Sequence, residues 1–289
     1  MGSNGSRPRA GTRRRTHAER VAGRDGYFAP ESVIRRVGNS PLVPLLGGGP
    51  AVLLQVAHPL VAAGVTVHSD YRRDLWRRLL RTLRALYLIT YGSKDEADAA
   101  GAAVRAVHAC VRGTTRFRLG PFPAGTAYSA ADPELMLWVH ATLVETSLAV
   151  YHRFVYRLRR EEQEAYYRDM ALMARLFGTP SDVIPPTLAD FRDYLRGELS
   201  SPRICVTEPA RDVAGVILDA PLPAPLRLIA PAHRLSTAAL LPPRLRCDYG
   251  LRCDPARSLA LKAAALSIRV AAVPLFLAAA RVSPPAYAV

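Results

Sequence analysis

Four histidines lie in apolar, helix-forming stretches and offer imidazole nitrogens for chemistry. They are His58, His68, His108 and His140. His108 stands four residues after Val104 in AVRAVHACVRG, which places it on the apolar face of a helix. A buried imidazole needs a partner for each ring nitrogen, because an unpaired polar atom costs on the order of a few kcal/mol. We expect all four side chains to point inward, as hydrogen-bonded core residues or as metal ligands.

A second polar group lies on the helix predicted over 69–92. In RRLLRT, Arg78, Arg81 and Thr82 stand at i, i+3 and i+4, so they emerge on one side. Most arginines of this helix are explained as a row of charged side chains on its solvent-exposed face. An inward-facing Arg78 beside Thr82 calls instead for an anion, because a guanidinium stays charged when buried. An apolar pocket with an imidazole, a guanidinium and a hydroxyl suits haem, with iron on histidine and propionates on the other two.

Motifs of several other enzyme classes are absent. The sequence contains no GxGxxG, GxxxxGK[ST], GxSxG or HExxH segment, and no paired Glu-x-x-His motif of a di-iron bundle. It also contains no CxxCH. Any haem is therefore expected to be held without covalent attachment.

The composition indicates one folded helical domain. Of 289 residues, 49% are hydrophobic and 22% are charged, which is typical of globular proteins. Alanine, leucine and arginine dominate, and strand-like alternation is hard to find. We predict an all-α, single globular domain over 25–289, preceded by a disordered arginine-rich arm at 1–24. Four cysteines without a CxxC pair suit a reduced, cytoplasmic setting.

The net charge of +15 raises the question of acidic partners. Residues 1–40 hold nine arginines and three acidic residues, but no zinc-finger, helix-turn-helix or RNA-binding strand motif accompanies them. A basic structural or nucleic-acid-associated protein is thus the weakest alternative. No stretch reaches the ~18 apolar residues of a membrane span. The nearest, 270–280, contains Pro274 and suits a core helix or a peripheral membrane contact.

Capping residues and hydrophobic periodicity predict the helices. They cover 51–67 with a kink at Pro59, 69–92, 93–113 with a glycine end, 128–155 capped by Ser129 or Asp132, and 161–178 with a glycine end. The glycine- and proline-rich segment 38–50 is predicted to be a loop. Shorter helices are expected after residue 200.

Five motifs in one order resemble a known family. QVAHPLVAAGVTVHS, RxxxT, TYG, VHACVRG and YSAADPELMLWVHATLV are similar to segments of the MpaB-type oxygenases, which include the catalytic domain of rubber (latex-clearing) oxygenases. The resemblance spans about residues 50–180 and continues more loosely to 242–251. It implies a globin-reminiscent helical fold with one b-type haem.

The resemblance also implies site residues. In rubber oxygenases the RxxxT motif serves the haem, and a downstream helical histidine is the proximal iron ligand. The matching residues here are Arg78 and Thr82 for haem binding and His108 for iron. His140, in the equally apolar WVHATLV, stays open as the axial ligand or as a further haem-binding residue.

The distal side departs from the rubber-cleaving members. They carry a lysine directly before the threonine, where this chain has Arg81, and a distal glutamate on the preceding helix. Residues 51–68 contain no glutamate and offer only Gln55, His58 and His68. We expect Arg81, His58 and His68 to be the catalytic residues that hydrogen-bond or protonate activated oxygen.

These features together predict a haem b-dependent oxygenase that acts on an apolar small molecule with dioxygen. Oxidative cleavage of a carbon–carbon double bond in an isoprenoid-like substrate is the leading reaction. The alternatives are a haem- or lipid-binding protein, or a haem-dependent desaturase-type oxidase. The sequence leaves the oligomeric state open.

Overall fold

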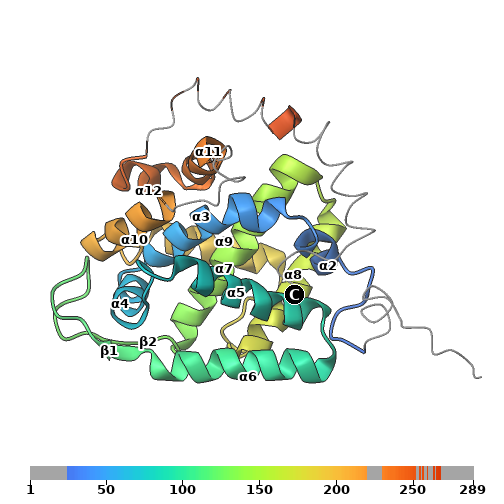
Figure 1. Cartoon of the computed structure of the whole chain (residues 1–289), viewed down its shortest axis with the longest axis horizontal. Coiled ribbons are helices and arrows are strands. Elements are labelled where there is room, and N and C mark those ends of the chain that lie inside the picture. Colours follow the sequence, from blue (N-terminus) through green and yellow to red (C-terminus); the bar gives the residue numbers. More distant parts are fainter. Residues whose placement is uncertain are drawn as a thin grey trace, which may run out of the picture.

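The computed structural model describes residues 25–219 and 230–251, together with 254, 256, 259, 263 and 265–267. Across these residues helices dominate, and the strands found there form one two-stranded hairpin (Figure 1). The predicted all-α fold is therefore confirmed. The predicted arm at 1–24 and the apolar stretch 270–280 lie outside the described residues.

The elements are numbered along the chain. In order they are α2 (Val33–Gly38), α3 (Leu42–Val56), α4 (Pro59–His68), α5 (Leu75–Tyr91), α6 (Lys94–Cys110), β1 (Arg112–Thr114), β2 (Ala127–Ser129), α7 (Pro133–Val150), the π-helix η1 (Tyr151–Val155), α8 (Arg160–Phe177), α9 (Leu188–Ser200), α10 (Glu208–Leu218), α11 (Ala230–Leu240) and α12 (Pro243–Asp248).

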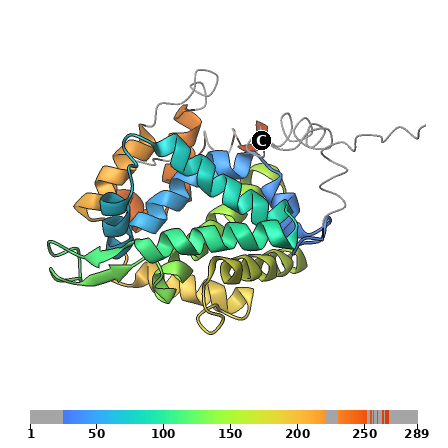
Figure 2. The same cartoon turned by 60° about the horizontal axis from the view of Figure 1, so that its bottom comes forward.

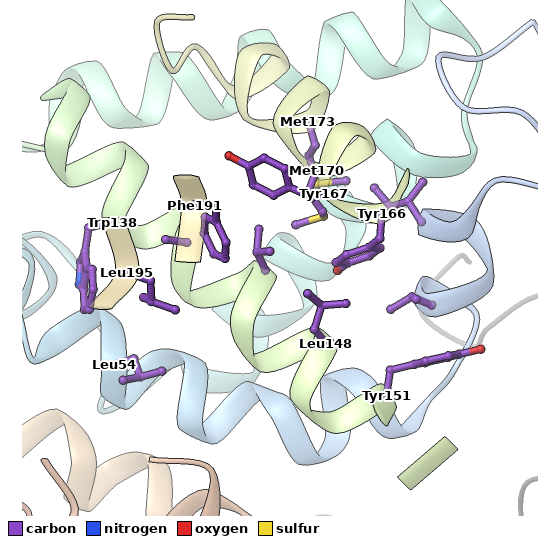
Figure 3. Packing of buried hydrophobic residues seen from close by; sticks show 14 of the residues in the cluster. Leu54, Trp138, Leu148, Tyr151, Tyr166, Tyr167, Met170, Met173, Phe191 and Leu195 are labelled. Carbon is purple, nitrogen blue, oxygen red and sulfur yellow. The ribbon is translucent and has the colours of Figure 1, made fainter. Parts of the chain in front are cut away.

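Helix α7 runs through the centre of the core. It is apolar on nearly all sides, so it must be surrounded by other elements. Figure 3 shows Trp138 and Leu148 of α7 among residues that include Met170 of α8 and Phe191 of α9. Helix α3 packs along another side, where the Trp138 indole nitrogen donates to the Gln55 carbonyl at 3.2 Å.

Helix α3 begins at Leu42, so the prediction of a loop over 38–50 is wrong for most of that segment. Its glycines allow close approach of other helices. A Cβ on Gly49 would lie 2.5 Å from Thr237 Oγ1 of α11, and one on Gly47 would lie 3.4 Å from a side chain of α7. Packing with two helices therefore outweighs the low helix propensity of glycine.

The apolar segment 51–67 forms parts of two helices, not the single kinked helix that was predicted. α3 ends at Val56, α4 begins at Pro59, and the two axes differ by 107°. Pro59 occupies the first turn of α4, where its missing N–H is not needed. His58 caps the same turn, because its Nδ1 accepts the Leu60 N–H at 3.3 Å.

Among the described residues, no single helix has both the length and the apolar composition required to cross a bilayer. The pair α3 and α4 meets that requirement jointly, by length and composition alone, but is sharply bent. Many residues of both helices are buried against other helices.

Helices α5 and α6 form an antiparallel hairpin closed by Gly92 and Ser93. α5 begins at Leu75, later than predicted. Ser93 caps α6 reciprocally with Glu96, whose carboxylate accepts the Ser93 N–H at 2.8 Å. A Cβ on Gly92 would clash with the Leu88 carbonyl oxygen, so this turn requires glycine. Figures 1 and 2 show the two helices close at this turn and farther apart at the other end, near α4.

The helix predicted over 93–113 ends earlier, at Cys110. Val111 is extended (φ −91°, ψ 91°), and the chain continues into β1, which pairs antiparallel with β2. Gly113 serves this hairpin and not a helix end, because a Cβ there would lie 2.7 Å from Tyr128 Oη. Strands this short leave too little alternation for sequence patterns to indicate them.

The other predicted helices agree well with the structure. Asp132, and not Ser129, caps α7 by accepting the Glu134 N–H at 2.9 Å. The last five residues of 128–155 widen into η1. Gly178 ends α8 in the left-handed conformation (φ +101°), as its sequence position predicts.

Candidate functional site

His58 is buried at the start of α4. Besides its capping bond, its ring packs 5.4 Å from the Phe122 ring, between centroids. Burial, with a smaller effect from the charge of Arg203, lowers the pKa of His58 to about 4, so the ring is neutral. Its hydrogen bond and ring contact thus go to α4 and to the loop between β1 and β2.

His140 lies in the core on α7, only 6% exposed. It interacts with the Met170 backbone of α8, while its Nε2 is enclosed with no hydrogen-bond partner among the described residues. Burial lowers the pKa of His140 to about 4. It is therefore a neutral core histidine with one ring nitrogen unsatisfied.

His68 is exposed, so the prediction that it points inward is wrong. The buried residues of α4 lie before its last turn, which extends beyond the covering helices. The His68 Nε2 lies 3.3 Å from the Tyr128 hydroxyl of β2, and the ring meets Tyr128 edge-on. This contact ties the end of α4 to the hairpin.

Arg78 is half-buried near the start of α5. Its Nη1 donates to Ser69 Oγ at 2.7 Å. Burial and the neighbouring positive charge of Arg81 lower the pKa of Arg78, and no carboxylate within the described ranges offsets them. The guanidinium therefore lacks a counter-charge, which is the condition for binding an anion.

Arg81 and Thr82 both lie on the exposed surface of α5. The Thr82 hydroxyl donates back to the Arg78 carbonyl at 3.1 Å. The structure thus keeps Thr82 next to Arg78 and leaves the Arg81 guanidinium in solvent. Sequence reasoning missed Ser69, because a serine ahead of a helix is more simply explained as a cap.

One face of α6 is buried in its first half and less well covered in its second, where Val104 and His108 are half-buried. Ala97 and Ala100 are buried, and helical spacing places Val104, Val107 and His108 on the same face. Val107 is nonetheless 62% exposed. The His108 Nδ1 is enclosed without a hydrogen-bond partner in the described part of the chain, and burial lowers the pKa of His108. A partly exposed apolar face beside an unsatisfied nitrogen is suited to a bound group.

Arg78 and His108 stand at the same level of the α5–α6 hairpin. Arg78 lies fourteen residues before Gly92, and His108 lies fifteen residues after Ser93. At 1.5 Å per residue both are about 22 Å from the turn. The antiparallel packing of the two helices therefore places these two residues at the same, open end of the hairpin, one on each helix.

Helix α4 closes a third side of this open end. A Cβ on Gly64 would lie 3.5 Å from Val111 Cγ1 and 3.8 Å from the Tyr128 ring, so α4 lies directly against the end of α6 and against β2. Helices α4 and α6 each carry an exposed valine in this region, namely Val67 and Val107. The candidate site is thus apolar, with Arg78, His108 and His68 as its polar groups.

The described residues contain no group of three or more histidine, cysteine, aspartate or glutamate side chains placed to hold a metal ion. Cys110, Cys205 and Cys247 are free thiols. A haem iron needs as little as one imidazole from the protein. A single histidine such as His108 or His140 would therefore suffice as the protein ligand of a haem iron.

Comparison with known sequences identifies the family. The profile described as "ER-bound oxygenase mpaB/B'/Rubber oxygenase, catalytic domain" matches residues 35–270. The chain belongs to this family. Its relatives include uncharacterized proteins of Mycobacterium bovis and Mycobacterium tuberculosis, each 28% identical over 214 residues, which is 71% of this chain and 80% of the relative. No solved structure matches the chain significantly.

Membership confirms the resemblance that the five motifs indicated. It gives this MpaB/rubber oxygenase domain an oxygenase role in general, as an oxidoreductase that uses oxygen and a small-molecule substrate. The matched range contains α3 to α12 complete, and therefore the whole open end of the α5–α6 hairpin.

Proposed function

We propose that the chain is a haem b-dependent oxygenase whose cofactor lies at the open end of the α5–α6 hairpin. His108 binds the iron, and Arg78 with Thr82 holds a propionate. The main support is the partly exposed end of the α6 face, beside a His108 nitrogen that is enclosed and has no partner among the described residues. Within the same residues no carboxylate offsets the charge of Arg78, at the same level on α5, and a propionate would supply that negative charge.

The protonation states of these residues fit the cofactor. Burial lowers the pKa of His108, which favours the neutral imidazole that binds metal ions. A propionate beside Arg78 would offset the burial and the Arg81 charge that lower its pKa. When bound, haem supplies a redox-active iron that can activate dioxygen.

The surrounding residues handle the substrate and protons. Val67 and Val107 offer exposed aliphatic surface to an apolar substrate. His68 is oriented by Tyr128 and precedes Ser69, the hydrogen-bond partner of Arg78. Its Nε2 is thus placed to hold a proton at the edge of the site. Arg81 adds positive charge there.

In this proposal His58 has a structural role, because its Nδ1 caps α4 and its ring packs on Phe122. His140 has a structural role in the core, where it packs from α7. The cytoplasmic location of the protein remains a prediction.

The absorption spectrum of protein produced with ample haem tests the cofactor and its ligand. We expect a Soret band that His108→Ala abolishes and His140→Gln preserves, with circular dichroism confirming that both variants fold. Loss in His140→Gln and retention in His108→Ala would assign the iron to His140. A wild-type protein that stays colourless would refute haem binding.

The propionate contact has its own test. A hydrogen bond to a charged group contributes about 1.5–3 kcal/mol, so Arg78→Gln should speed haem transfer to apomyoglobin by about tenfold or more. Arg84→Gln is the matched control, since Arg84 is an exposed arginine of the same helix. Equal transfer rates for both variants would contradict the role of Arg78.

The reaction is tested by isotope labelling. Oxidative cleavage of a double bond by dioxygen places both oxygen atoms in the two carbonyl products. A desaturase-type oxidase would reduce the oxygen to water, and a binding protein would consume none. Oxygen uptake and mass spectrometry with ¹⁸O₂ and an isoprenoid hydrocarbon therefore distinguish the three functions.

A further inference from the structure

The loop that joins β1 and β2 stands out from the helices at one edge of the molecule (Figures 1 and 2). It displays an aromatic side chain, Phe117, which is 75% exposed. Arg116 and Arg118 on either side are also exposed. A largely exposed aromatic side chain between two exposed arginines combines the residue types that are found at membrane interfaces.

The loop is held by its own hydrogen bonds. The Thr115 N–H donates to the Thr126 carbonyl at 2.9 Å, and Leu119 and Phe122 exchange backbone bonds at 2.8 and 3.1 Å. The Phe122 ring packs on His58. One aromatic side chain of the loop is thus fixed inward, while the ordered backbone keeps Phe117 outward.

The segment of the chain that contains Phe117 carries charges of one sign. Between Asp98 and Asp132 the sequence contains no acidic residue and four arginines, which are Arg105, Arg112, Arg116 and Arg118. The acidic residues that follow are engaged elsewhere. Asp132 caps α7, and Glu134 forms an ion pair with Arg203 at 2.7 Å. The hairpin therefore suits a partner that is both negatively charged and apolar.

The hairpin arises from the same end of the fold as the candidate site. α6 passes directly into β1, and His68 at the end of α4 contacts Tyr128 of β2. The exposed side chains of Val67 and Val107 belong to the ends of these two helices. A surface that meets the loop would thus lie close to the open end of the α5–α6 hairpin.

We propose that the β1–β2 loop docks the protein on an anionic lipid membrane, with Phe117 inserted at the headgroup level and Arg116 and Arg118 on lipid phosphates. Aromatic residues favour this interface, and basic residues near it add attraction. Docking would bring an apolar substrate dissolved in the membrane to the site. Vesicle binding can be measured both with and without haem. A negative result for membrane docking would therefore leave the cofactor proposal untouched, and the reverse also holds.

Flotation of the full chain with vesicles tests docking. At 0.15 M salt we expect binding to phosphatidylcholine vesicles that contain phosphatidylglycerol, and far weaker binding to pure phosphatidylcholine. Phe117→Ser should lower the partition coefficient about tenfold. Arg116→Ser with Arg118→Ser should lower it about thirtyfold, because each arginine contributes about 1 kcal/mol at an anionic surface.

Tyr156→Ser is the matched control. Tyr156 is an aromatic residue, 52% exposed and followed by the exposed Arg157, but it lies beyond the far end of α7. The eighteen residues of α7 separate it from the β hairpin by about 27 Å. This variant should bind vesicles like the wild type.

Insertion of residue 117 into the lipid is measured separately by fluorescence quenching. Electrostatic binding through the basic N-terminal segment would not produce this signal. Brominated lipids should quench Phe117→Trp more than Tyr156→Trp, since the two native tryptophans contribute equally to both. The proposal is overturned if wild type does not float with anionic vesicles, if Phe117→Ser floats equally, or if Phe117→Trp is not quenched. It is also overturned if duplex DNA displaces the protein from the vesicles and if DNA binding requires Arg116 and Arg118 but not Phe117.

Discussion

His140 should make the stability of the fold depend on pH in a measurable way. Its pKa falls from 6.5 to about 4 on folding, because the core disfavours the charged imidazole. Above pH 6.5 the ring is neutral in both states and contributes nothing. Below that pH the unfolded chain binds a proton that the folded protein does not bind until about pH 4. The free energy of unfolding therefore decreases as the pH falls between these values.

The size of this effect follows from the two pKa values. Between pH 7 and pH 5, a histidine shifted from 6.5 to about 4 lowers the free energy of unfolding by about 2 kcal/mol. The half-buried carboxyl groups of Glu145 and Asp169, whose pKa values are raised by desolvation, act in the opposite direction. The total pH dependence thus mixes several groups, and a variant is needed to isolate His140.

His140→Gln removes the titrating group and retains hydrogen-bonding capacity. Urea denaturation of both proteins at pH 7, 6 and 5, with matched haem content, gives the difference in their free energies of unfolding. The advantage of the wild type should shrink by about 2 kcal/mol over this range. A difference that stays constant would show that His140 titrates alike in both states, which contradicts its burial in a neutral form.

Two further predictions concern the elements that position the site. Gly49→Ala should cost about 1–3 kcal/mol, because its Cβ would lie 2.5 Å from Thr237 Oγ1. Gly48→Ala in the same helix meets no atom within 4 Å and should be neutral or stabilising by up to about 1 kcal/mol; equal melting shifts for both would refute the packing role. Ser93→Ala should cost about 1 kcal/mol through its lost bond with Glu96, and Ser93→Thr should restore most of it in urea denaturation.

Local signals predicted the parts of the fold that depend on local structure. Gly178 ends α8 and Asp132 caps α7, because both act within one helical turn. The segment 38–50 was mispredicted for the opposite reason. Its glycines are helical because α11 and α7 approach closely, and that contact joins residues nearly 190 positions apart, such as Gly49 and Thr237.

The features of the candidate site also divide into those that local sequence predicts and those that depend on packing between helices. Residue types and spacing predict Arg78, Thr82 and His108 as cofactor residues, and the antiparallel hairpin places Arg78 and His108 at one level. The outward position of His68 and the bond from Arg78 to Ser69 were not predictable. Both depend on how far α4 extends past its neighbours, which no single helix encodes.

The turn at Gly92 and Ser93 has a mechanical consequence. It is fixed by a reciprocal cap and by a glycine that tolerates no side chain, whereas α5 and α6 lie farther apart at their other ends (Figures 1 and 2). With a lever arm of about 22 Å, a change of 5° in the angle between these helices moves their far ends by about 2 Å. Substitutions near Gly92 and Ser93 would therefore change the separation of the far ends of α5 and α6, where the proposed cofactor site lies.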